Sequence, residues 1–155
     1  MRTRILSVAW CFAAVAVVAA NAPALRAPDQ APGAAFDSIS YRDSGGFAGG
    51  GTGKRLSVTP DGRVEAHSRY GAKIVSQLHV EDLSTLSAAI SAVDWAHVEH
   101  AYQVRGAADL VVRDLVVVVH GTTYETHADP LFKLPPPLQA VFDRLDEFYR
   151  RALKS

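Results

Sequence analysis

Apolar and polar residues alternate through much of the chain, and this period-two pattern predicts half-buried β-strands. Four segments show it in the first half of the folded region: residues 36–43, 54–59, 63–69 and, less regularly, 72–79. In the first of them Ile39 and Tyr41 fall on one face. The triplet Pro60-Asp61-Gly62 separates the second segment from the third, and its composition is typical of a tight turn. These two segments are therefore predicted to form a hairpin.

Two other segments have the spacing of amphipathic helices. Residues 81–93 place apolar side chains at i, i+3, i+7 and i+10: Leu83, Leu86, Ile90 and Val93. A second helix is predicted to begin at the three prolines 135–137, because proline is tolerated in a first helical turn. Its apolar stripe consists of Leu138, Val141, Phe142, Leu145, Phe148 and Tyr149.

Between these helices the chain is rich in β-branched residues, which favour a strand over residues 110–119. Both faces of this segment are apolar near its end, which suits a central strand covered by a helix. A turn at Gly121-Thr122 would return the chain through residues 124–128. The predicted fold is α+β: an antiparallel sheet of four to five strands with two amphipathic helices packed on one face.

The N-terminus has the layout of a secretory signal peptide. Arg2 and Arg4 precede the uncharged, largely apolar stretch 5–20, and small residues follow it. We expect residues 1–22 to form the signal, with cleavage near residues 20–24. The alternative is an uncleaved membrane anchor, but the stretch is shorter than the roughly 20 residues that a spanning helix needs.

Three regions follow from these patterns. After the signal, residues 23–35 are rich in proline and alanine and are predicted to form a linker, and residues 36–153 a single α+β domain. The expected location is secreted or periplasmic, with no stable membrane insertion after signal removal. Cys11 is the only cysteine and would leave with the signal, so no disulfide is expected in the mature chain.

Composition and motifs give no indication of an enzyme or of a cofactor. The chain carries 16 basic and 16 acidic residues, so charge gives no case for nucleic-acid binding. The glycine-rich segment 44–53 fails as a phosphate-binding loop, because Ala48 and Arg55 occupy positions that need glycine and serine or threonine. Ser44 is interpreted as a turn residue, because no Gly-x-Ser-x-Gly motif surrounds a serine.

Histidines and acidic residues show no recognisable site spacing. None of the six histidines has the spacing of a zinc-binding helix motif, so no metal is predicted, although His120 and His127 flank a predicted turn and could face each other. The acids near the later strands are interpreted as surface or turn residues: Asp109, Asp114, Glu125 and Asp129.

The segment Tyr41-Arg-Asp-Ser-Gly-Gly-Phe-Ala-Gly49 resembles the opening signature of the emfourin-like family, proteinaceous inhibitors of thermolysin-like (M4) metallopeptidases such as protealysin. The resemblance covers roughly residues 36–153, since the Leu83/Leu86 stripe, Asp94-Trp95 and Asp129 follow in a similar order. It implies an inhibitor that binds without chemistry, with a secreted M4-type metallopeptidase as partner.

The candidate partner-binding residues lie in that signature: Arg42, Ser44, Gly45, Gly46, Phe47, Ala48 and Gly49. Phe47 is the first candidate for an apolar anchor, and the alternative is that its ring folds back onto the sheet. The alternative function is an exported binding or structural module for another partner, without inhibitory activity.

Overall fold

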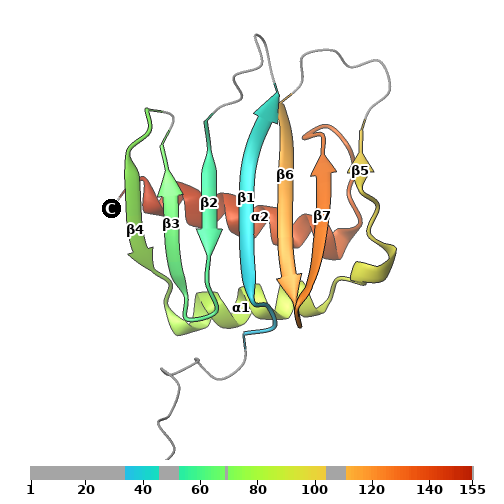
Figure 1. Ribbon diagram of the computed structural model, residues 1–155, viewed down its shortest axis with the longest axis horizontal. Helices are drawn as coiled ribbons and strands as arrows, with labels where there is room; N and C mark the ends of the chain where they lie inside the picture. The colour runs from blue at the N-terminus through green and yellow to red at the C-terminus, as the bar shows by residue number, and fades with distance from the viewer. Residues whose placement is uncertain (1–33, 46–52, 69, 104–110, 155) are drawn as a thin grey trace, which may run out of the picture.

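The computed structural model describes residues 34–45, 53–68, 70–103 and 111–154, which form a seven-stranded sheet backed by two helices (Figure 1). The strands lie in the order β4-β3-β2-β1-β6-β7-β5. Their bounds are β1 Ser38–Gly45, β2 Arg55–Val58, β3 Arg63–His67, β4 Lys73–Gln77, β5 Ala101–Tyr102, β6 Val111–Val119 and β7 Thr122–Ala128. The helices are α1 Val80–Ser91 and α2 Pro136–Ala152, with a short 3-10 turn at Trp95–His97.

The predicted α+β class is confirmed, whereas the predicted count of four to five strands is wrong. The sheet is mixed because β5 pairs parallel with β7, through Ala101 opposite His127 and Tyr102 opposite Ala128. All other neighbouring strands are antiparallel. A strand of two residues has no alternation of its own to detect, and it exists because β7 offers a free edge.

Two tight turns set the register of the hairpins. Gly62 ends the β2–β3 turn with φ of 83°, a conformation that glycine adopts without strain. The β6–β7 turn is made by His120 and Gly121, with φ of 50° and 76°, as in the two-residue turns that match strand twist. This turn lies one residue earlier than the predicted Gly121-Thr122.

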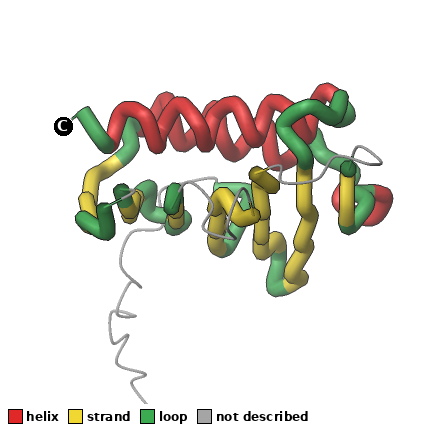
Figure 2. Tube along the Cα trace, turned by 90° about the horizontal axis from the view of Figure 1, so that it is seen from above, coloured by secondary structure: helices red, strands yellow, loops and turns green. Residues whose placement is uncertain are grey.

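Both helices lie on one side of the sheet, as predicted, and the core fills the space between them (Figure 2). The face of each strand that points to the helices carries its apolar residues: Ile39, Tyr41, Leu56, Val58, Val64, Leu115 and Val117 are all at most 2% exposed. The Tyr41 and Phe142 rings meet edge to face, with centroids 5.8 Å apart. These contacts place β1 and β6 at the centre of the sheet.

Strand β6 lies inside the sheet with one face covered by the helices, as predicted, and its second apolar face, which includes Val116 and Val118, is half-buried on the side away from the helices. Strand β1 departs from the prediction, because it continues through Ser44 and Gly45, which pair with β6, so the predicted loop begins later than expected. Strand β6 favours this extension because it is nine residues long and offers partners as far as Val111.

The predicted signal peptide and almost all of the predicted linker lie outside the described residues. Within the described part of the chain, neither helix has the length and apolar character needed to cross a bilayer.

Candidate binding site

The sequence signature divides between a strand and the segment that follows it. Arg42 and Ser44 belong to β1, and their side chains lie on the sheet face away from the helices. Gly45 is the last residue of β1 and pairs with Val111 of β6. The other four candidates lie outside the described residues: Gly46, Phe47, Ala48 and Gly49.

Asp114 on β6 binds the first part of this signature. Its side chain is only 5% exposed, and Arg42 Nε donates to its Oδ2 at 2.9 Å. His127 Nδ1 lies 2.7 Å from its Oδ1, and the Ser44 hydroxyl also hydrogen-bonds the carboxylate. Burial acts to raise the pKa of Asp114, but the hydrogen bonds from His127, Ser44 and Arg42 together outweigh it and hold that pKa below its usual value.

The Asp114 carboxylate selects which ring nitrogen of His127 carries a proton. A carboxylate only accepts hydrogen bonds, so the His127 Nδ1 atom must carry a proton and donate it. The other ring nitrogen, Nε2, lies 3.6 Å from Glu125 Oε1. The His100 ring meets the His127 ring edge to face, with centroids 4.7 Å apart. His127 therefore lies between two carboxylates on a partly exposed strand surface.

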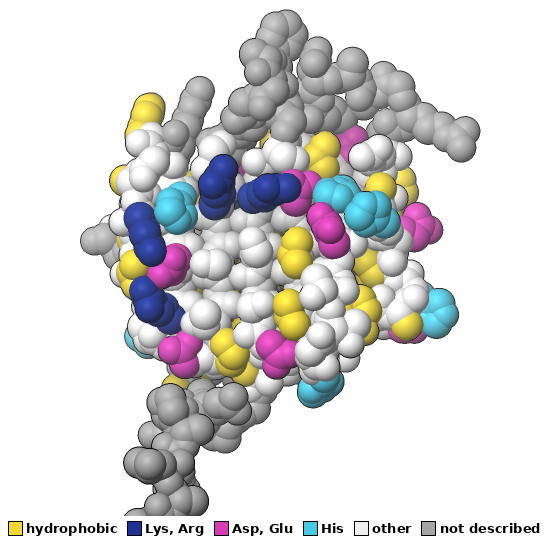
Figure 3. Space-filling model, in the orientation of Figure 1, with side chains coloured by type: hydrophobic (Ala, Val, Ile, Leu, Met, Phe, Trp, Pro, Cys, Tyr) yellow, Lys and Arg dark blue, Asp and Glu magenta, His cyan; other side chains and the backbone are white. Residues whose placement is uncertain are grey.

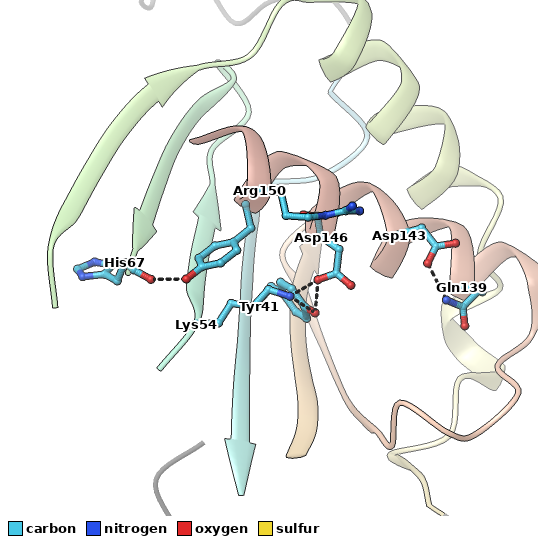
Figure 4. Close-up of polar contacts among 8 residues, drawn as sticks. Tyr41, Lys54, His67, Gln139, Asp143, Asp146 and Arg150 are labelled. Atoms are coloured by element: carbon cyan, nitrogen blue, oxygen red, sulfur yellow. Dashed lines mark hydrogen bonds and ion pairs between the residues drawn. The ribbon is translucent and has the colours of Figure 1, made fainter. Parts of the chain in front are cut away.

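A second polar cluster lies on the opposite side of the same strands, between the sheet and α2 (Figure 4). The Tyr41 hydroxyl donates to Asp146 Oδ1 at 2.7 Å and accepts from Lys54 Nζ at 3.1 Å. Lys54 also forms an ion pair with Asp146. Its ammonium lies over the rings of Tyr41 and Tyr149, 4.7 and 5.3 Å from their centroids.

Burial, and then the negative charge of Asp146, raise the pKa of Tyr41 far above its usual value. The hydroxyl therefore stays protonated at neutral pH and remains a donor to Asp146. The neighbouring Tyr149 hydroxyl donates to the backbone carbonyl of His67 at 3.0 Å and so ties α2 to β3 (Figure 4).

Together the two clusters fix both ends of the glycine-rich segment. On its N-terminal side Arg42 and Ser44 are bound to β6, and on its C-terminal side Lys54 is bound to α2. The backbone N–H of Asp43 also donates to the Lys54 carbonyl at 3.0 Å. The residues just before segment 46–52 are therefore held on the sheet face away from the helices, and the residues just after it are held on the helix side.

The Asp114–His127 pair has two of the three members of a hydrolytic triad, and within the described residues no serine is hydrogen-bonded to His127 as the third. Ser44 hydrogen-bonds Asp114 and not the imidazole, whereas a serine nucleophile must contact the histidine that removes its proton. The free ring nitrogen faces Glu125 instead. The Asp114 carboxylate can hold the side chains of Arg42, Ser44 and His127 in fixed positions on this face of the sheet.

Two expectations about the acidic and histidine residues are wrong. Asp114 is a buried strand residue, at 4% exposure, rather than a surface or turn acid. Asp129 is also buried, at 3% exposure, but it lies in a turn as expected and accepts from the Leu131 N–H. Glu125 is exposed, and Asp109 lies outside the described residues. His120 and His127 do not face each other, because His120 forms the turn and His127 lies opposite Asp114 further along β7. In the described ranges no three His, Cys, Asp or Glu side chains are grouped so that they could hold a metal ion.

Sequence reasoning missed the pairing of Asp114 with His127, although a signal for it exists. With a two-residue turn at His120-Gly121, Val119 pairs with Thr122. Each step back along β6 then matches one step forward along β7, so Asp114 falls opposite His127. The pairing of Tyr41 with Asp146 has no such signal, because 105 residues separate the two and only the packing of α2 brings them together.

A search with protein-family models gives no match for this chain, and a comparison with curated proteins gives none either.

Proposed function

We propose that this chain is an exported binding protein that inhibits a thermolysin-like (M4) metallopeptidase by contact, without chemistry of its own. The sequence signature supports the choice of partner, and the signal-like N-terminus would bring the chain to the compartment where secreted peptidases act.

The observation that carries the proposal is the fixed base of the glycine-rich segment. Arg42 and Ser44, two of the signature residues, are bound to the buried Asp114, and Lys54 is bound to Asp146 across the sheet. A contact segment between fixed strands loses less conformational freedom on binding than one between mobile strands. The smaller loss of conformational entropy favours tight association, because ordering the contacting residues opposes every protein–protein contact.

The proposed mode of action needs a small number of anchors. Protein inhibitors of peptidases commonly bury about 800 Å² per partner, and a few residues near the centre supply most of the binding energy. Phe47 is our candidate for the apolar anchor, and Arg42 is our candidate for a polar contact at its edge. Glycines beside Phe47 would allow the two backbones to approach closely.

The test is an inhibition assay with the full chain, purified from the culture medium or periplasm, against several thermolysin-like peptidases acting on a peptide substrate. We expect an inhibition constant on the order of nanomolar, as for other specific protein inhibitors. Mass spectrometry of the same sample checks export, and the expected product begins between residues 21 and 25. Absence of inhibition at micromolar concentration contradicts the proposal and favours a binding or structural module with another partner.

Matched variants locate the contact. Phe47→Ala and Arg42→Gln are expected to weaken inhibition, whereas Arg144→Gln is the control. The Arg144 side chain on α2 is 43% exposed and forms an ion pair with Glu147. Arg42 is likewise partly exposed, at 56%, and ion-paired, but it lies on the sheet, whereas Arg144 lies in the helix layer. Urea unfolding of each variant separates lost contact from lost folding. Equal inhibition by all three variants would place the contact elsewhere.

A further inference from the structure

A row of basic side chains crosses the sheet face opposite the helices. Arg42 on β1 lies opposite Arg55 on β2, Arg55 opposite His67 on β3, and His67 opposite Lys73 on β4. Neighbouring strands are about 4.8 Å apart, so this cationic row extends roughly 14 Å at right angles to the strands. Figure 3 shows the lysine and arginine side chains of this face gathered over one half of it, with acidic and histidine side chains among them, whereas the other half carries acidic and histidine side chains.

The cationic row is only partly neutralised. Arg42 is paired with Asp114 and Lys73 with Glu65, which also pairs with Arg63. Arg55, in the middle of the row, is exposed and has no acidic partner among the described side chains. Like charges directly opposite each other in a sheet are destabilising. This half of the face thus carries four cations, Arg42, Arg55, Arg63 and Lys73, but only two carboxylates to neutralise them, so it attracts negative charge.

Beside Arg42 and Arg55 this face carries small polar side chains, and at the β4 edge the exposed Val75 lies next to Lys73. Ser40 and Ser57 lie opposite each other on the same face, one step along the strands from Arg42 and Arg55. The described strands present no Phe, Tyr or Trp side chain on this face, since Tyr41, Tyr102 and Tyr124 point to the helix side. Nucleic-acid bases bind such surfaces by stacking on aromatic rings, so the composition favours a ligand that offers carboxylates instead.

We propose that the cationic row is a docking surface for an acidic polypeptide segment of the partner, whose carboxylates pair with Arg55, with its neighbour Arg42 and with Lys73 at the β4 end of the row. The inference rests on the proposed function only in taking the partner to be a protein. A guanidinium can bind a carboxylate through two parallel hydrogen bonds, and that of Arg55 has no described acidic side chain to compete for it.

The expected strength follows from exposure. Each exposed ion pair contributes about 0.2–1 kcal/mol, so several carboxylates must bind together to give measurable affinity. Salt screens such pairs over about 10 Å at 0.1 M, so binding must weaken as salt rises. A surface of this kind speeds encounter with an acidic partner more than it slows dissociation.

The experiment measures binding of the full chain to a fluorescein-labelled peptide of ten glutamates by fluorescence anisotropy, with a ten-glutamine peptide as the matched neutral probe. We expect binding of the glutamate peptide alone, weaker at 300 mM than at 20 mM NaCl. Arg55→Glu should weaken it about tenfold or more, which corresponds to about 1.4 kcal/mol. Arg144→Glu, the same charge change in the helix layer, should leave it near the parent value.

Several results would overturn the inference: equal binding of the glutamine peptide, no loss in a folded Arg55→Glu chain, or tighter binding of a single-stranded oligonucleotide or of heparin than of the glutamate peptide. The two proposals fail separately. A chain that binds the glutamate peptide but inhibits no thermolysin-like peptidase refutes the proposed partner alone. A chain that inhibits the peptidase but ignores the peptide refutes the cationic row alone.

Discussion

Replacing Asp114 by asparagine removes the charge that holds Arg42, Ser44 and His127 while it keeps the shape of the side chain. The carboxylate is 5% exposed and accepts at 2.9 Å from Arg42 and at 2.7 Å from His127. Hydrogen bonds to charged groups contribute about 1.5–3 kcal/mol each when buried. The Arg42 side chain is 56% exposed, so its share is discounted to at most about 1 kcal/mol. We therefore expect a loss of about 2–3 kcal/mol at pH 7.

The pH dependence gives this prediction its sign. The pKa of Asp114 is lower in the folded chain than the value of about 3.9 expected when it is unfolded. Its stabilising effect is thus fully present above the unfolded pKa and is lost as the pH falls through the folded pKa. The difference in unfolding free energy between parent and Asp114→Asn should consequently shrink as the pH falls from 5 toward 2.

Urea unfolding followed by circular dichroism measures this difference. With m-values of about 1–3 kcal/mol per molar urea, the midpoint at pH 7 should fall by about 0.7–3 M. Asp143→Asn is the control, since Asp143 is exposed on α2 and accepts from Gln139, four residues earlier on the same helix. A difference that stays constant between pH 7 and pH 2, or an unchanged midpoint at pH 7, would refute the reasoning.

Two further predictions concern stability. Tyr41→Phe should destabilise the chain by about 1–2 kcal/mol, because Asp146 loses the hydroxyl that donates at 2.7 Å, and a neutral or stabilising effect in urea unfolding would contradict this. Gly62→Ala and Gly121→Ala both place a Cβ at positive φ and should each cost about 1 kcal/mol. Gly62→Ala should cost more, because its Cβ would meet Gln77 Nε2 at 3.0 Å and that of Gly121 meets nothing within 4 Å, so equal thermal midpoints would contradict the steric argument.

Local patterns predicted the parts of the fold that depend on neighbours in sequence. The stripes at helical period identify α1 and α2, and period-two alternation with the Pro60-Asp61-Gly62 turn identifies the β2–β3 hairpin. Strand β5 was not predicted from the sequence, because its two residues become a strand only by pairing with β7. The continuation of β1 through Ser44 and Gly45 was not predicted for the same reason, since β6 supplies the partners.

In the candidate site, too, the sequence predicted the local residues but not their distant partners. Arg42 and Ser44 were found through the signature, but the signature contains nothing about Asp114, which holds both of them. The cationic row was not predicted either, because Arg42 and Arg55 become neighbours only once β1 and β2 are aligned, and His67 joins them only through the pairing of β3 with β2. A balanced total charge concealed this local excess, since total charge carries no information about which residues share a face.

The central claim is that the chain binds a thermolysin-like peptidase through the sheet face and strand ends around Arg42. The most direct measurement is a map of backbone amide chemical-shift changes in the full, isotopically labelled chain as the inactivated peptidase is added. We predict the largest changes in β1, β2 and β6, with little change along α1 and the exposed face of α2. Changes confined to the helices, or no change at saturating peptidase, would contradict the account.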